Sequence, residues 1–124
     1  PGQYLVVGNT NVVAAAGAIK YVPPGVGNTD FIQNGPPDGI AIINTTTQTV
    51  IDSFSYEGPI TAANITGFPG PVNLVKGRVL PTATADSNTV NGSLCRLPNG
   101  TSTNDDETDW KFCTVPTPGA ANGP

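Results

Sequence analysis

The sequence predicts a single all-β domain, spanning residues 1–124, that is built from short strands. Gly and Pro contribute 15 and 13 residues, and Asn and Thr are also frequent, so residues that favour turns recur along the whole chain. Charged residues make up only 11% of the chain, against roughly 25% in an ordinary domain. Helix-forming Glu and Lys are therefore scarce, and many short strands joined by turns are favoured over helices.

The N-terminal part contains apolar runs that are separated by turn residues. The run 3–7 ends at a Gly-Asn pair and is typical of a buried strand. Residues 12–13 and 18–22 predict two further short strands, the second of which is ended by consecutive prolines. Residues 25–38 are rich in Gly, Pro and Asn, so this segment is expected to be mostly loop.

A β-hairpin is the clearest element of the chain. Residues 39–43 and 49–56 are rich in β-branched and aromatic side chains, and the five polar residues between them are a typical hairpin loop. Side chains alternate between the faces of a strand. The second strand is therefore expected to point one set of side chains to the core, with an aspartate as its odd member: Val50, Asp52, Phe54 and Tyr56.

The C-terminal part predicts two last strands, at 93–97 and 110–115, after weaker strand signals at 72–75 and 78–80. The chain has two cysteines, no CxxC spacing and no histidine, which favours a disulfide between Cys95 and Cys113 over a metal or redox site. Such a bridge is worth roughly 3 kcal/mol. It also indicates an extracellular protein, whether secreted or held at the cell surface.

N-glycosylation is a second indication of export. The chain has four N-x-[ST] sequons, and each is expected to be either a glycan acceptor or simply a polar turn. The acceptor residues are Asn44, Asn64, Asn91 and Asn99.

Charge and residue types exclude several classes of function. The net charge is −4 and only five basic residues are scattered along the chain, so no basic stripe exists for nucleic acid. No apolar stretch reaches the roughly 18 residues of a membrane span, so membrane insertion is not expected. Without histidine, Ser-His-Asp and Cys-His sites are excluded. Asp52 and Glu57 are the best carboxylate pair, but a hydrogen bond between Asp52 and a neighbouring strand or loop is the simpler expectation. No catalytic residue and no cofactor are predicted.

Two groups remain as candidate binding residues. In the acidic loop, Asp105, Glu107 and Asp109 could supply oxygen ligands to calcium. The alternative is a turn in which Asn104 or Asp105 caps a short helix. Trp110 could form a carbohydrate platform, or it could pack in the core beside the disulfide.

A family resemblance extends over nearly the whole chain. The segments that carry it are PGQYLVV at 1–7, DGIAII at 38–43, VIDSFSYEG at 50–58, SLCR at 93–96, DW at 109–110 and TPGAAN at 117–122. In this order and spacing they resemble the lamin-tail domain of secreted bacterial proteins. The resemblance implies an immunoglobulin-like β-sandwich of short antiparallel strands without catalytic activity, often an accessory module of exported or surface proteins.

The chain departs from that family at its start. Lamin-tail domains usually carry an additional front section with further strands before the segment that resembles residues 1–7. If those strands are missing here, the sandwich has open edges, which recruit strands from other chains. We therefore expect a structural module that assembles with itself or with another protein, completed by neighbouring chains and able to form fibres. The alternative is a carbohydrate- or surface-binding accessory domain of a secreted hydrolase.

Overall fold

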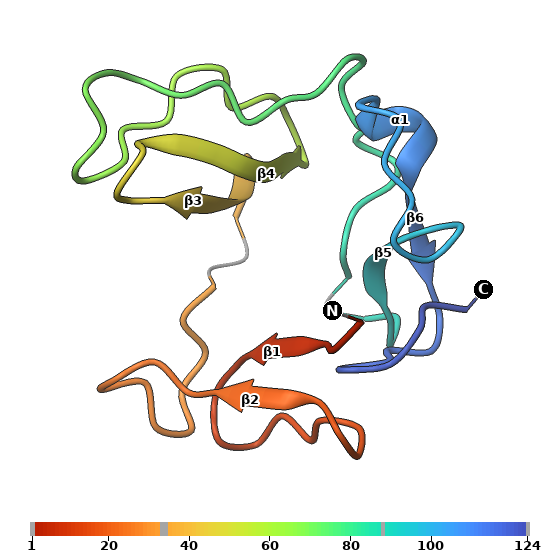
Figure 1. Ribbon diagram of the computed structural model, residues 1–124. Helices are drawn as coiled ribbons and strands as arrows, with labels where there is room; N and C mark the ends of the chain where they lie inside the picture. Colours follow the sequence, from red (N-terminus) through yellow and green to blue (C-terminus); the bar gives the residue numbers. More distant parts are fainter. Residues whose placement is uncertain (1, 33–34, 88, 124) are drawn as a thin grey trace.

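The structure is a computed structural model that describes residues 2–32, 35–87 and 89–123. It is made of strands and loops with a single helical turn, which confirms the all-β prediction. The strands form three two-stranded sheets that lie apart from one another (Figure 1). In chain order the elements are β1 (Leu5–Val7), β2 (Ile19–Tyr21), β3 (Asp38–Asn44), β4 (Thr49–Tyr56), β5 (Ser93–Arg96), α1 (Asp106–Asp109) and β6 (Trp110–Cys113).

The predicted hairpin is confirmed as the antiparallel pair β3–β4, with Asp38 opposite Tyr56 and Asn44 opposite Thr49. The side chain of Asn44 closes the connecting loop, because its Oδ1 accepts hydrogen bonds from the backbone N–H groups of Thr46 and Thr47, both at 3.0 Å. This local bond explains why the short polar segment turns where the sequence predicts.

The burial pattern of β4 differs from the expectation. Tyr56 is buried as predicted, but Val50, also predicted to face the core, is 36% exposed, and Ser53 and Ser55 on the opposite face are buried. The loop that follows β4 folds back over that face. Ser55 Oγ accepts a hydrogen bond from the backbone N–H of Ile60 at 3.0 Å, and a Cβ added at Gly39 of β3 would come within 2.8 Å of Leu74. Small side chains are needed where backbone and loop approach so closely.

The N-terminal sheet contradicts two predictions. Strands β1 and β2 pair in parallel, with Leu5 opposite Ile19 and Val7 opposite Tyr21, so not all strands are antiparallel. Within β1 only Val6 is buried, so this strand is not the buried strand that its apolar run predicts. The other expected strand in this region, at 12–13, is not formed.

The C-terminal strands are confirmed as the antiparallel pair β5–β6. The disulfide between Cys95 and Cys113 joins these two strands, with a Cα–Cα distance of 6.0 Å. The weaker signals at 72–75 and 78–80 do not become strands, and only an isolated bridge between Ala63 and Val72 forms in that part of the chain.

The hydrophobic core is small. Six apolar residues are buried, whereas fifteen large apolar residues are exposed among those that the structure describes. The chain exposes 7722 Å², roughly a quarter more than the about 6,200 Å² that scaling with mass gives for a compact 12.6 kDa protein. The fold therefore leaves much apolar surface uncovered.

Among the described residues, no helix is long and apolar enough to cross a membrane.

Candidate functional site

A charged cluster connects the central hairpin to the C-terminal strands. The carboxylate of Asp52 on β4 pairs with the guanidinium of Arg96 on β5, with an Nη1–Oδ2 distance of 2.8 Å and an Nη2–Oδ1 distance of 3.0 Å. It also accepts a hydrogen bond from the ammonium group of Lys76. Burial raises the pKa of Asp52, but the hydrogen bonds from both cations outweigh it, so the pKa lies below its ordinary value. Asp52 is thus a structural anchor, which confirms the expected hydrogen bond to a neighbouring strand or loop.

Three aromatic rings stack beside this anchor. The ring of Trp110 on β6 lies 3.9 Å from that of Phe54 on β4, with an angle of 17° between the planes, and Phe54 in turn stacks on Tyr56 at 5.4 Å. The guanidinium carbon of Arg96 lies 4.9 Å from the centroid of Trp110. Trp110, which is half-buried, therefore packs against groups of its own chain, and the stack joins β4 to β6.

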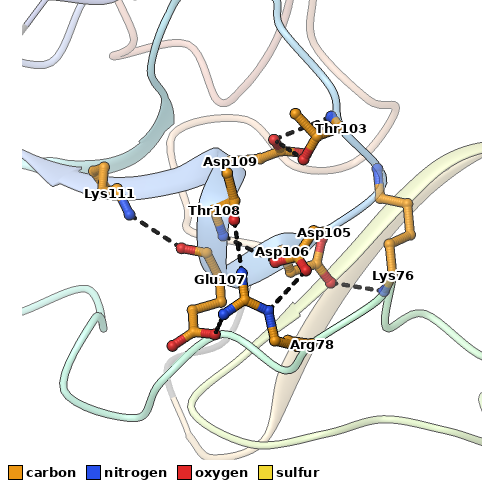
Figure 2. A network of polar contacts seen from close by, with 9 residues as sticks. All are labelled: Lys76, Arg78, Thr103, Asp105, Asp106, Glu107, Thr108, Asp109 and Lys111. Atoms are coloured by element: carbon orange, nitrogen blue, oxygen red, sulfur yellow. Dashed lines mark hydrogen bonds and ion pairs between the residues drawn. The ribbon is translucent and has the colours of Figure 1, made fainter.

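The acidic loop forms a local network around Arg78 (Figure 2). Asp105 is the N-cap of α1 and accepts a hydrogen bond from the backbone N–H of Thr108 at 3.1 Å, which confirms the predicted capped turn. Arg78 Nε contacts Asp105 Oδ2 at 2.9 Å, and the same guanidinium forms an ion pair with Glu107. One exposed arginine thus neutralises two of the acidic residues.

The other two carboxylates of α1 have contrasting environments. Asp109 accepts hydrogen bonds from the backbone N–H of Thr103 at 2.9 Å and from its hydroxyl at 2.8 Å. Burial raises the pKa of Asp109, but these bonds lower it below its ordinary value. Asp106 is fully buried; its Oδ2 accepts a hydrogen bond from the backbone N–H of Lys76 at 2.9 Å, while its Oδ1 has no partner. Burial therefore raises the pKa of Asp106.

The contacts of the acidic loop determine whether its three candidate calcium ligands could act together. Asp105 and Glu107 are paired with Arg78, and Asp109 turns toward Thr103, so the three carboxylates have separate partners. Within residues 2–32, 35–87 and 89–123, no group of three or more His, Cys, Asp or Glu residues is placed to hold a metal ion. The arrangement of the loop gives the calcium prediction no support.

The four sequons differ in how their asparagine side chains are used. All four asparagines are exposed. The Asn99 side chain links two parts of the chain, because its Nδ2 donates to the hydroxyl of Tyr4 at 3.1 Å and its Oδ1 accepts from the backbone N–H of Asn122 at 2.9 Å. A glycan on Asn99 would replace a hydrogen of the nitrogen that makes the first contact. The better placed acceptors are therefore Asn44, Asn64 and Asn91.

Uncovered apolar surface is a feature that could bind a partner. On the hairpin, Ile40 and Ile42 are 38% and 59% exposed, and they line a shallow cavity of about 140 Å³ together with Phe54 and Trp110. Each of the three sheets has only two strands, so every strand has an edge without a partner strand in the described part of the chain. Such edges and faces are where further strands bind.

Part of this arrangement was not predictable from sequence. Arg96 and Lys76 lie 44 and 24 positions from Asp52, so no local pattern marks them as its partners. Arg78 likewise lies 27 positions from Asp105. By contrast, the cap of α1 joins two residues that are only three positions apart, and it was visible as a local motif.

Comparisons with known proteins found no match for this chain. No family model matches the chain, and neither a curated protein nor a solved structure is significantly similar to it.

Proposed function

We propose that this chain is a non-catalytic extracellular assembly module, an immunoglobulin-like β-sandwich of lamin-tail type that neighbouring protein chains complete. The observation that carries the proposal is the uncovered apolar surface: fifteen large apolar side chains are exposed in the described residues, against six buried apolar residues, two of which are the disulfide cysteines. Where exposed apolar side chains gather into patches, they mark sites of protein association.

Chemistry of the charged groups supports a non-catalytic role. The chain has no histidine. The carboxylate of Asp52 is neutralised by Arg96 and Lys76, which leaves it without the raised pKa of a general acid. Glu57, the other candidate, lies just beyond β4 with a left-handed backbone (φ 57°). The carboxylate of Asp52 is therefore used to hold the fold together, whereas Glu57 Oε2 is buried without a hydrogen-bond partner among the described residues.

Extracellular placement is supported by the disulfide and by the exposed sequons. The Cys95–Cys113 bridge persists in oxidising compartments. Asn44, Asn64 and Asn91 are exposed, as glycan acceptors must be.

The alternative function, carbohydrate binding by a secreted accessory domain, has less support. A sugar platform needs a free aromatic face. Here Trp110 stacks on Phe54 at 3.9 Å and also lies against Arg96. Binding to a glycan array that is lost in Trp110→Ala, but kept in Tyr21→Ala, would favour this alternative over assembly.

Negative-stain microscopy and light scattering of the purified chain test the proposed function. Ordered fibres or defined oligomers are expected. Monodisperse particles of 12.6 kDa would contradict it.

A further inference from the structure

A cavity between the central hairpin and β5 combines apolar and aromatic walls with one carboxylate. Its volume is about 270 Å³, which suits a small ligand, since drug-sized ligands occupy roughly 300 Å³ or more. Asp86 is the one charged residue among the described residues that line it. The lining includes Ile32, Ile40, Phe54, Tyr56, Asp86 and Leu94.

Polar atoms at this cavity have no partner within the described part of the chain. Oδ1 of Asp86 is buried without a hydrogen-bond partner, and so is Oε2 of Glu57, the residue that follows Tyr56. Tyr56 is 5% exposed, and no hydrogen bond joins its hydroxyl to another described residue. Buried carboxylates and buried tyrosine hydroxyls are normally paired. These unpaired groups indicate that a hydrogen-bond donor is bound here.

The charge around Tyr56 is negative. Asp38 lies opposite Tyr56 in the β3–β4 ladder. Glu57 is the next residue in the chain, and Asp86 lines the same cavity. Burial, together with the negative charges of these three carboxylates, raises the pKa of Tyr56 to about 12. The surroundings of the cavity therefore favour a cation over an anion.

The chain does not supply this cation itself. Three of its five basic residues pair with carboxylates outside the cavity, and the other two donate to backbone carbonyls. In chain order the five are Lys20, Lys76, Arg78, Arg96 and Lys111. A positive charge in the cavity must therefore arrive with a ligand.

We propose that this cavity binds an organic cation, a primary alkylammonium group with a short apolar arm. The ammonium group donates hydrogen bonds to the carboxylate of Asp86 and to the hydroxyl oxygen of Tyr56. Nearby aromatic rings stabilise a cation further. The arm packs against the aliphatic side chains of the lining, which an inorganic cation would leave uncovered.

Two sources carry this chemistry, a free aliphatic amine and the lysine side chain of another protein. The inference goes beyond the proposed function and does not depend on it, because the cavity lies within a single chain. A wild-type chain that stays monomeric would contradict the assembly role and leave the cavity unaffected.

The test uses n-butylammonium chloride as the probe and n-butanol as the neutral control of the same length. Two-dimensional NMR of the backbone amides locates binding at Leu94 and gives the dissociation constant. Asp86→Asn removes the charge with little change of shape. Asp30→Asn is the matched variant, because Asp30 is exposed, contacts Asn9 and does not line the cavity.

Wild type and Asp30→Asn are expected to bind butylammonium equally well, and Asp86→Asn at least roughly 10-fold more weakly, as the loss of a charged hydrogen bond predicts. Equal affinity for butanol would show that the cavity takes apolar groups regardless of charge. Equal affinity of the two variants would show that Asp86 does not hold the ammonium group. Either result, or the absence of saturable binding to wild type, would overturn the inference.

A second probe, Nα-acetyl-lysine methylamide, distinguishes the two sources. Binding at least as tight as that of butylammonium indicates a protein lysine, and weaker binding indicates a free amine. Circular dichroism monitors folding, and Asp86→Ser replaces Asp86→Asn if that chain does not fold.

Discussion

Asp52 on β4 and Arg96 on β5 form a two-point ion pair, with N–O distances of 2.8 and 3.0 Å, that ties the central hairpin to the disulfide-bonded strands. Two parallel N–H···O bonds hold the planar guanidinium in a fixed orientation. In that orientation Arg96 also covers the ring of Trp110. In a chain with so few buried apolar residues, this pair is expected to carry much of the contact between the two parts.

Arg96→Ala is expected to lower the free energy of unfolding by about 2 kcal/mol, the range for hydrogen bonds to charged groups. The change leaves the partly buried Asp52 with Lys76 as its one cation and uncovers Trp110. Urea unfolding followed by tryptophan fluorescence measures the loss. Arg78→Ala is the control: its side chain is 63% exposed, so its loss should be smaller. Equal losses in both variants would contradict the anchoring role of Arg96.

Acid should remove the contribution of Asp52. Its folded-state pKa lies below the ordinary value of 3.8, so its stabilising effect is present above that value and is lost as pH falls through the lowered pKa. Asp52→Asn should therefore be less stable than wild type at neutral pH, with a difference that shrinks in acid. Unfolding curves between about pH 6 and pH 2 measure it. A stability difference between the two proteins that does not change over this range would show that the charge of Asp52 does not stabilise the folded state.

Replacing either of two aspartates of α1 by asparagine should change the melting temperature, and the two changes should have opposite signs. Asp106 has a raised pKa, so its contribution to stability is full below 3.8 and is lost as pH rises through the folded-state value. Asp106→Asn removes the buried charge and keeps an acceptor for the N–H of Lys76. It should raise the melting temperature at neutral pH by about 2 to 4 °C.

Asp109→Asn is the matched comparison for that variant. The pKa of Asp109 is lowered, and its two oxygens accept bonds from the backbone and the hydroxyl of Thr103. An amide cannot accept with both of its terminal atoms, so this variant should melt at a lower temperature than wild type. Shifts of the same sign in both variants, measured by calorimetry at neutral pH, would contradict the assigned environments.

Reduction of the disulfide is expected to lower the free energy of unfolding by roughly 3 kcal/mol, because the bridge closes a loop between positions 18 residues apart. Intact mass should rise by about 2 Da on reduction, since two thiols replace one bond. Cys95→Ala/Cys113→Ala should reproduce the loss without a reductant. An unchanged mass on reduction would show that the cysteines are not paired.

Local patterns predicted the local parts of this fold. The β3–β4 hairpin was recognisable because both strands and their loop lie within 19 consecutive residues and alternate in polarity. The capped turn of α1 was recognisable for the same reason.

Features of the fold that depend on contacts between distant residues could not be predicted from local patterns. The apolar residues of β1 predict a buried strand, and no neighbouring residue in the sequence indicates that Leu5 and Val7 are exposed. Its parallel pairing with β2 depends on the path of the connecting loop. The burial of Ser55 depends on the loop that follows β4, which brings Ile60 and Leu74 over a face that the small polar residues alone would place in solvent.

The assembly role is tested most directly by the mass of the wild-type chain in solution. Sedimentation equilibrium over rising concentration measures it without any change to the sequence. The uncovered apolar surface predicts a mass that grows from 12.6 kDa to at least twice that value. A mass that stays at 12.6 kDa at every concentration would contradict the account.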